Sequence, residues 1–271
     1  MKKKSILLTI LSILIILGFL QLFLTQKENT KEDSQFIKLS QGKISYKEFG
    51  EGNNTIILIH GSPGNKESLY QLASQIKNHK IYILDMYGFG QSEPKVKNYG
   101  IESSAQVVKE FMDKIEIKKT TIAGYSWGGG VAENFAYLYP EKTTSLLLIA
   151  GMGIQEGEAT HNYYTEHLRY LISYPFVVFY PGSFYSNYNK RKGFMRSFMD
   201  SDQRTIKDKM QRIQSKAILI YGKNDTNVLP SQAEEHHSLI NNSQLFWFEG
   251  GHHTPLNNPE EIAQIININL K

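Results

Sequence analysis

The sequence predicts an α/β fold with a mostly parallel, doubly wound sheet, interrupted by one insertion and preceded by a transmembrane anchor. Short runs of β-branched and apolar residues recur along the chain, as in strands buried on both faces. Segments of helical periodicity lie between most of these runs, and this alternation indicates a parallel sheet covered by helices. Several runs end in glycine-containing turns with polar side chains, where parallel sheets place their sites.

The chain begins with a basic segment that is followed by an apolar one. Lysines at positions 2–4 precede an uncharged apolar run from Ile6 to Leu24. This run is about 19 residues long, close to the ~20 needed to cross the hydrocarbon core, and no small-residue cleavage site follows it. We therefore expect residues 1–25 to be an uncleaved membrane anchor, with a cleaved signal peptide and secretion as the alternative. The positive-inside rule would place the remaining chain outside the cytoplasm.

The rest of the chain divides into a tether, a core and an insertion. Residues 26–35 are polar, charged and aperiodic, as in a flexible tether. About 235 residues remain, enough for one large α/β domain. We assign 36–152 and 213–271 to the core. Residues 153–212 form the insertion, because the strand–helix alternation stops there and aromatic residues become frequent.

Composition excludes several classes of function. The formal net charge is +4, and the basic residues form no concentrated stripe, so nucleic-acid binding is not indicated. There is no cysteine, which excludes a disulfide framework and a thiolate nucleophile. The histidines lack metal-site spacing with a carboxylate partner, so neither a metal nor a cofactor is predicted.

Seven strands and five helices are expected in the core. A loosely alternating strand is expected at 42–49, and six buried strands at 55–59, 80–84, 120–123, 145–150, 217–221 and 244–248. Helices are expected at 68–76, 103–115, 131–138, 231–240 and 259–268.

The run at 120–123 leads into Gly124-Tyr125-Ser126-Trp127-Gly128, a G-x-S-x-G pattern between a strand and a helix. A serine on such a sharp turn has a strained backbone and an exposed hydroxyl, and glycines flank it because a Cβ would collide with neighbouring elements. Taken alone the pattern is weak, and an ordinary strand–turn–helix is an equally good interpretation.

Four further stretches occur in a fixed order around this turn. They are His60-Gly61-Ser62-Pro63-Gly64, the turn from Asp85 to Ser92, Gly222-Lys223-Asn224-Asp225 and Gly250-Gly251-His252. With them the chain resembles the α/β-hydrolase superfamily over nearly all of 35–271. The resemblance implies that 153–212 form a helical cap over the carboxyl edge of the sheet. Most of the cap's aromatic residues would form its own core, and a few would face Ser126.

The three residues that carry the chemistry follow the order of this superfamily, Ser, then Asp, then His. A serine hydroxyl needs a base within hydrogen-bond reach, and the base needs a carboxylate that fixes its tautomer. Ser126, Asp225 and His252 each follow a predicted strand, so we expect a nucleophile, an orienting acid and a base. His253 is the alternative base. Asp85 is the alternative acid, although the resemblance makes its turn structural, and Asp225 itself could be a turn-forming residue.

Backbone N–H groups must stabilise the oxyanion that this chemistry generates. Trp127 supplies one donor by its position after the nucleophile. By resemblance, Ser62 supplies the other from the loop after the 55–59 strand. A plain glycine–proline turn is the alternative for that loop, and His60 is interpreted as a hydrogen-bonded structural histidine.

The resemblance implies a serine hydrolase that cleaves carboxylic esters of small or lipid-like substrates through an acyl-enzyme. One alternative resembles the proline iminopeptidases and needs acidic cap residues to hold a free amine, for which Glu156, Glu158 and Glu166 are candidates. A non-catalytic ligand-binding member of the fold is the other alternative. The predicted partners are a small-molecule ester and, through the anchor, a membrane.

Overall fold

A computed structural model of the chain describes residues 9, 12, 13, 16, 34–93, 95–154, 162–179 and 188–270. Most of the predicted anchor, 1–25, therefore lies outside the described residues. The predicted tether, 26–35, also lies outside them except for its last two residues. Within the described part, none of the helices combines the length and the apolar character that crossing a bilayer requires.

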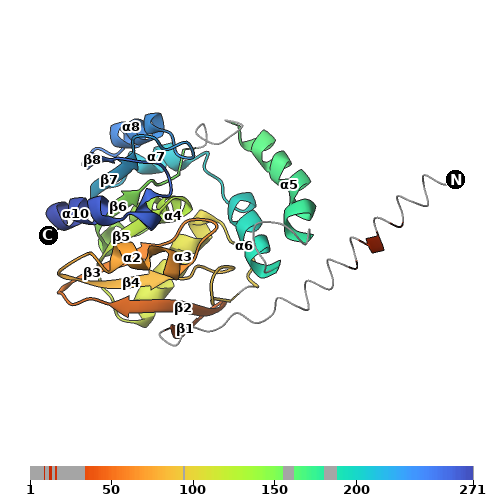
Figure 1. Cartoon of the computed structure of the whole chain (residues 1–271). Helices are drawn as coiled ribbons and strands as arrows, with labels where there is room; N and C mark the ends of the chain where they lie inside the picture. Colours follow the sequence, from red (N-terminus) through yellow and green to blue (C-terminus); the bar gives the residue numbers. More distant parts are fainter. Residues whose placement is uncertain are drawn as a thin grey trace.

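One sheet of eight strands runs through the molecule in the order β1-β2-β4-β3-β5-β6-β7-β8 (Figure 1). The strands are β1 (Gln35–Leu39), β2 (Gly42–Phe49), β3 (Asn54–Ile59), β4 (His79–Leu84), β5 (Thr120–Tyr125), β6 (Thr143–Ile149), β7 (Lys216–Gly222) and β8 (Ser243–Phe248). The pairs β1–β2 and β2–β4 are antiparallel, and all the others are parallel. The predicted mostly parallel sheet is confirmed.

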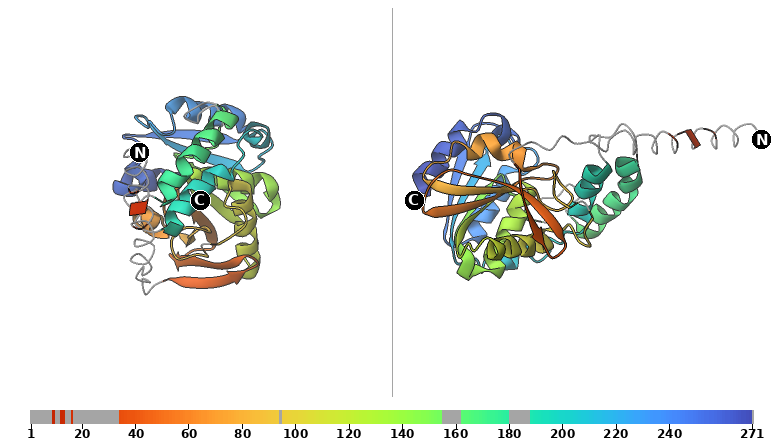
Figure 2. Two further views of the ribbon diagram at one scale, coloured as in Figure 1. Left: turned by 90° about the vertical axis from the view of Figure 1, so that its right-hand side faces the viewer. Right: turned by 90° about the horizontal axis from the view of Figure 1, so that it is seen from below.

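Helices cover both faces of this sheet (Figure 2). The α-helices of the described residues are α2 (Tyr70–Ala73), α3 (Ile101–Lys114), α4 (Trp127–Leu138), α5 (Tyr163–Phe179), α6 (Tyr188–Met199), α7 (Ile206–Met210), α8 (Pro230–Leu239), α9 (Thr254–Asn257) and α10 (Glu260–Asn269). Two short 3₁₀ helices, η1 (Lys66–Leu69) and η2 (Pro140–Lys142), complete the set. The helix expected at 68–76 is thus η1 followed by α2, and it ends at Ala73, three residues earlier than expected.

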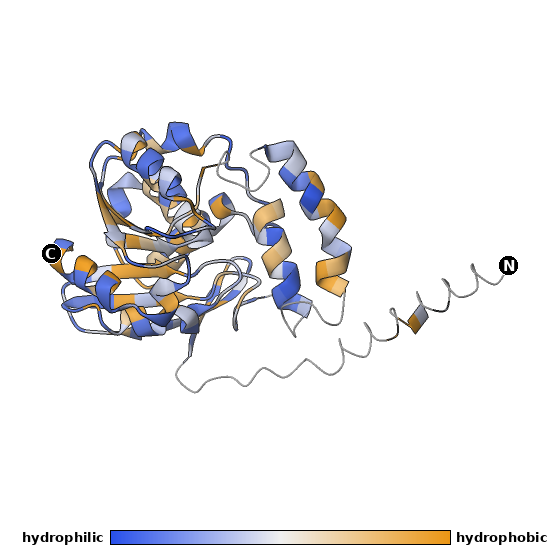
Figure 3. Ribbon diagram, turned by 45° about the horizontal axis from the view of Figure 1, so that its top comes forward, coloured by the Kyte–Doolittle hydropathy of each residue, from blue (hydrophilic) through white to orange (hydrophobic). Residues whose placement is uncertain are grey.

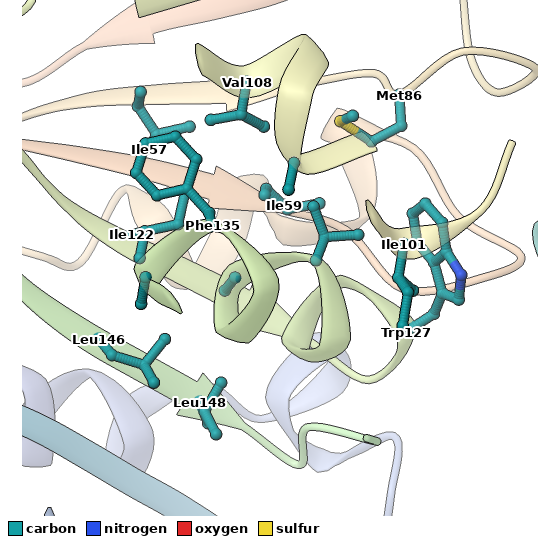
Figure 4. Packing of buried hydrophobic residues seen from close by; sticks show 14 of the residues in the cluster. Ile57, Ile59, Met86, Ile101, Val108, Ile122, Trp127, Phe135, Leu146 and Leu148 are labelled. Carbon is teal, nitrogen blue, oxygen red and sulfur yellow. The ribbon is translucent and has the colours of Figure 1, made fainter. Parts of the chain in front are cut away.

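Two apolar clusters hold these layers together. Side chains of α3, α4, α7 and α8 pack against one face of the sheet, and those of η1, α2 and α10 pack against the other. The first cluster contains Ile57 and Ile122 from the sheet, Val108 from α3 and Phe135 from α4 (Figure 4). Burying each such side chain contributes roughly 1.5–3 kcal/mol, so the central strands are fixed in position.

The helices α5 and α6 lie side by side at one end of the sheet, apart from the two covering layers (Figures 1 and 2). The connection between these two helices, 180–187, and the segment 155–161 that precedes α5 lie outside the described residues. Helix α7 also lies within the expected insertion, 153–212, but the side chains of Ile206 and Met210 pack in the first cluster of the core.

Three aromatic residues on the outer face of α5 are exceptions to the expectation that most aromatic residues of this region form its own core. Tyr164, Phe176 and Phe179 are each more than half exposed, and Leu168, Leu171 and Ile172 share the same face. Apolar segments are visible on α5 in Figure 3. Because α5 packs chiefly against α6, its far face has no further layer of described residues to bury it.

Candidate active site

Ser126 occupies a sharp turn between β5 and α4, at the carboxyl end of a fully buried strand. Its φ of 53° lies in a region that residues with a Cβ rarely adopt. Backbone hydrogen bonds hold the turn: Ser126 N donates to Ile149 O over 3.1 Å, and Met152 N donates to Ser126 O over 3.0 Å. The end of β6 therefore fixes the strained serine, which is 6% exposed.

The glycines beside Ser126 are required by close backbone approach. A Cβ on Gly124 would lie 2.0 Å from Gly128 O, and one on Gly128 would lie 2.4 Å from Ile59 O. Real Cβ atoms do not approach backbone oxygens so closely, so α4 packs at this distance from β3 and β5 only with glycine at both positions.

We expect Gly128→Ala to lower the free energy of unfolding by about 2 to 4 kcal/mol, because backbone atoms at the end of β3 would have to move. Gly130→Ala is the matched control on the same helix, since its Cβ would meet its nearest atoms at 3.4 Å. That variant should stay within about 1 kcal/mol of wild type. Urea unfolding measures both, and equal stabilities would contradict the close-approach argument.

Three side chains converge at this end of the sheet. His252 Nε2 lies 2.9 Å from Ser126 Oγ, and His252 Nδ1 lies 2.8 Å from Asp225 Oδ2. Asp225 follows β7 and His252 follows β8, as the sequence predicts. Because a carboxylate only accepts hydrogen bonds, the Nδ1–H donates to Asp225 and Nε2 is left to accept from the serine hydroxyl.

The carboxylate of Asp225 is held by its own loop. Its Oδ1 accepts hydrogen bonds from the N–H groups of Asn227 and Val228, at 2.8 and 2.9 Å. The side chain is fully buried, so these bonds and the imidazole satisfy a charge that would otherwise be costly. The loop geometry therefore leaves Oδ2 directed at His252.

Tyr125 is a further residue of the site that sequence reasoning missed, although it lies inside the G-x-S-x-G pattern. Its hydroxyl donates to His252 O over 2.8 Å, and the two rings lie 5.3 Å apart between centroids. Burial, and secondarily the charge of Asp225, raises the pKa of Tyr125. The hydroxyl thus remains a donor that fixes the backbone of His252.

His253 and Asp85, the residues considered as alternatives, take no part in the contacts that join Ser126, His252 and Asp225. His253 lines the same cavity, but His252 makes both contacts described above. Asp85 is fully buried and accepts hydrogen bonds from Lys66 Nζ over 2.7 Å and from Gln91 N over 2.9 Å. Its carboxylate therefore closes the turn after β4. Lys66, which the sequence analysis did not single out, is the buried partner of that carboxylate.

The two residues predicted to hold the oxyanion both lie near Ser126. Trp127 is the first residue of α4, so its N–H is one that the helix leaves without an intrahelical acceptor. Ser62 lines the cavity from the loop after β3, and a Cβ on Gly61 would lie 3.0 Å from Ser126 Cβ. The loop therefore approaches the serine closely.

Ser197 on α6 connects these two residues. Its Oγ lies 2.8 Å from Ser62 Oγ, and its carbonyl accepts a hydrogen bond from the indole N–H of Trp127 over 3.2 Å. Because the Ser197 hydroxyl donates to Phe194 O, it accepts from the hydroxyl of Ser62. Helix α6 is thus bonded to both sides of the predicted oxyanion hole.

His60 has the structural surroundings that the sequence analysis expected. Its Nδ1–H donates to Gly61 O over 2.7 Å, and its Nε2 accepts from Met86 N over 3.1 Å. Burial lowers the pKa of His60, which keeps the ring neutral as these two bonds require. The ring links the loops that follow β3 and β4.

A cavity of about 620 Å³ opens over Ser126 and His252. Helix α6 lines it with Phe194 and Phe198, and α5 lines it with Glu166, Arg169 and Tyr170. A second hollow of about 550 Å³ lies at the amino ends of the strands, away from these residues. Parallel sheets bind ligands at the carboxyl ends of their strands, so the first cavity is the candidate active site.

Of the three acidic residues considered as amine-binding candidates, Glu166 is the one that the structure describes. Glu156 and Glu158 lie outside the described residues. Glu166 lines the cavity, and its Oε1 lies 2.9 Å from Arg169 Nη1. Over the described ranges, no cluster of three or more His, Asp or Glu side chains is arranged to hold a metal ion.

Comparison with known proteins identifies the fold. A family model described as the alpha/beta hydrolase fold matches residues 54–173. An esterase from Exiguobacterium antarcticum superposes with a TM-score of 0.71 at 19% identity, covering 86% of this chain and 97% of the esterase. At that level of identity, the likeness shows the same fold.

Curated relatives match over shorter stretches. The dihydrolipoyllysine-residue acetyltransferase component of the acetoin cleaving system of Cupriavidus necator is 30% identical over 141 residues, which are 52% of this chain and 37% of that protein. Lipase 3 of Moraxella sp. is 28% identical over 134 residues, 47% of this chain and 42% of the lipase. The match thus spans less than half the length of either relative.

Proposed function

We propose that this chain, which belongs to the α/β-hydrolase superfamily, is a serine hydrolase that cleaves carboxylic esters of small or lipid-like substrates. The observation that carries the proposal is the continuous line of contacts from Ser126 through His252 to Asp225, at 2.9 and 2.8 Å. A nucleophile, a base and a carboxylate that orients the base are the groups that acyl transfer by serine requires.

In the proposed reaction, Ser126 Oγ attacks the ester carbonyl carbon while His252 Nε2 takes the hydroxyl proton. Asp225 stabilises the imidazolium that forms, and the N–H groups of Ser62 and Trp127 stabilise the oxyanion of the tetrahedral intermediate. The carbon–oxygen bond to the alcohol then breaks, and the alcohol leaves with the proton from His252. Water attacks the acyl-enzyme by the same route, releasing the acid and restoring Ser126.

The cavity and its surroundings favour an ester with an apolar acyl part. Phe194, Phe198, Met152 and Leu256 line the cavity beside Ser126. The exposed apolar face of α5 favours substrates presented by a lipid phase. Relatives of this chain include proteins named as a lipase and as an esterase, which supports ester cleavage.

Labelling with a fluorophosphonate probe, followed by an ester panel of increasing acyl length, tests the proposal. We expect the wild-type protein to be labelled at Ser126 and to hydrolyse members of the panel. His252→Ala should lose labelling, whereas His253→Ala, the adjacent control, should retain it because His253 makes neither contact of the triad. Labelling that persists after Ser126→Ala would defeat the assignment.

The amine-binding alternative has one observation in its favour, since Glu166 lines the cavity. Cleavage of proline naphthylamide, with no turnover of any ester in the panel, would favour a peptidase over the proposed esterase. The absence of both turnover and labelling would favour a ligand-binding protein.

A further inference from the structure

One face of α5 contributes three polar residues to the wall of the active-site cavity. Arg169 and Tyr170 follow Glu166 by three and four residues, so both side chains lie on the same side of the helix as that of Glu166. Neither the serine chemistry nor the oxyanion hole uses any of them. Their arrangement therefore requires a separate explanation.

Glu166 and Arg169 form an ion pair of unequal burial. The side chain of Glu166 is 2% exposed, that of Arg169 is 54% exposed, and Arg169 Nη1 lies 2.9 Å from Glu166 Oε1. A buried carboxylate needs a hydrogen-bonded partner, and Arg169 provides one. The guanidinium also lies 5.7 Å from the centroid of the Tyr170 ring, within cation–π range. Two neighbours thus hold its orientation.

The guanidinium keeps binding capacity after these contacts. An arginine carries five N–H donors in a planar fork, and the bond to Glu166 uses one of them. Among the described residues that line the cavity, Arg169 is the only lysine or arginine. An arginine that is held by an acidic neighbour and exposed in a cavity with no other lysine or arginine among its described lining residues is suited to a planar or tetrahedral anion.

We infer that Arg169 forms an anion-binding subsite, which selects esters that carry a carboxylate or a phosphate away from the scissile bond. Glu166 and Tyr170 act as positioning residues that hold the guanidinium. The inference rests on the proposed ester hydrolysis. Ser126 and Arg169 come from the sheet and from α5, so the substrate would bridge the two with its reacting carbonyl at one end and its anion at the other.

A cationic substituent fits this wall poorly. The carboxylate of Glu166 is buried and already bonded to Arg169, so an ammonium group would have to displace the guanidinium or approach its positive charge. The same pair therefore favours an anionic ester over the free amine that an aminopeptidase needs.

Matched esters test the subsite. We would compare three para-nitrophenyl esters of equal chain length. The octanoate ester is neutral, the aminooctanoate ester carries a cationic ammonium group, and the suberate mono-ester carries an anionic carboxylate. A second arm compares monobutyrin with butyryl glycerol phosphate and thus distinguishes a phosphate on the alcohol side from a carboxylate on the acyl side. We expect the wild-type kcat/KM to be highest for the anionic member of at least one arm.

Arg169→Gln should lower the anionic-to-neutral ratio of kcat/KM in that arm by about 10- to 100-fold, mainly through KM, because a charge-assisted bond is lost from bound substrate. Arg169→Lys should give an intermediate ratio, since it keeps the charge without the fork. Arg212→Gln is the matched control: Arg212 is exposed and does not line the cavity, so the ratio should stay within about twofold.

Calorimetric titration of Ser126→Ala with suberate and with glycerol phosphate separates this inference from the proposed function. Binding of either anion that Arg169→Gln abolishes in the same background supports the subsite even if no ester is hydrolysed. Ester turnover with equal rates for anionic and neutral members, or a preference for the cationic ester, overturns the subsite and leaves the serine hydrolase standing. Equal anion binding with and without Arg169 overturns it as well.

Discussion

Replacing Ser126 by alanine is expected to lower kcat for ester hydrolysis by on the order of 10⁵-fold or more. The change removes the hydroxyl that is proposed to form the acyl-enzyme, while the proposed N–H donors of Ser62 and Trp127 remain. A small residual rate over that in water would come from those donors and from binding. The best ester of the acyl-length panel provides the measurement, and the mass of the intact protein after acylation provides a second one.

The Ser126→Ala protein should remain folded, because the turn is held by backbone bonds to β6 rather than by the hydroxyl. Ser231→Ala, a change on the exposed surface of α8, is the control and should leave kcat unchanged. If Ser126→Ala lowered kcat for ester hydrolysis by less than about tenfold, the nucleophile would have to be another residue.

Asp225→Asn is expected to lower kcat by about 10³- to 10⁴-fold through the tautomer of His252. Asn227 N and Val228 N both donate to Oδ1, so the amide oxygen of an asparagine would occupy that position. Its NH₂ group would then face His252 Nδ1, which would have to accept a hydrogen bond. The ring proton would move to Nε2, and Nε2 could no longer take the proton of Ser126.

This variant tests orientation separately from packing, since asparagine has nearly the same shape as aspartate. Asp202→Asn is the control, because Asp202 is exposed and pairs with Arg204 on the surface. Single-turnover acylation should slow to the same extent as kcat if acylation limits the rate. Normal acylation by Asp225→Asn would mean that Asp225 serves only as a turn residue.

The sequence was sufficient to predict the central strands, because their apolar runs are local signals, and the three residues that converge, because their motifs follow one another in the order of the superfamily. Continuous apolar runs mark strands buried on both faces, and Asp225 and His252 directly follow two such runs. β1 was not predicted, since it is an edge strand whose residues are mostly exposed and lack that signature. The outward apolar face of α5 was not predicted either, because periodicity shows that a helix is amphipathic but not what covers it.

The contacts that sequence reasoning missed join residues that are remote along the chain. Tyr125 bonds the backbone of His252 across 127 residues, and Ser62 meets Ser197 across 135. A single sequence contains no pattern that pairs such positions, and tyrosine and serine are common enough to attract no attention on their own. The choice of His252 over His253 came from the resemblance, and the structure agrees with it, because the ring of His252 contacts both Ser126 and Asp225.

The double attachment of Ser197 gives α6 a thermodynamic link to the chemistry below it. Displacement of α6 away from the sheet must break its bonds to Ser62 and to the indole of Trp127, at a cost of about 1–3 kcal/mol in total. Those same two residues carry the amides proposed to meet the developing negative charge. By reciprocity, a change that displaces the Ser62 loop or Trp127 also changes the position that α6 prefers, so the helix above the cavity and the predicted oxyanion hole below it are energetically coupled.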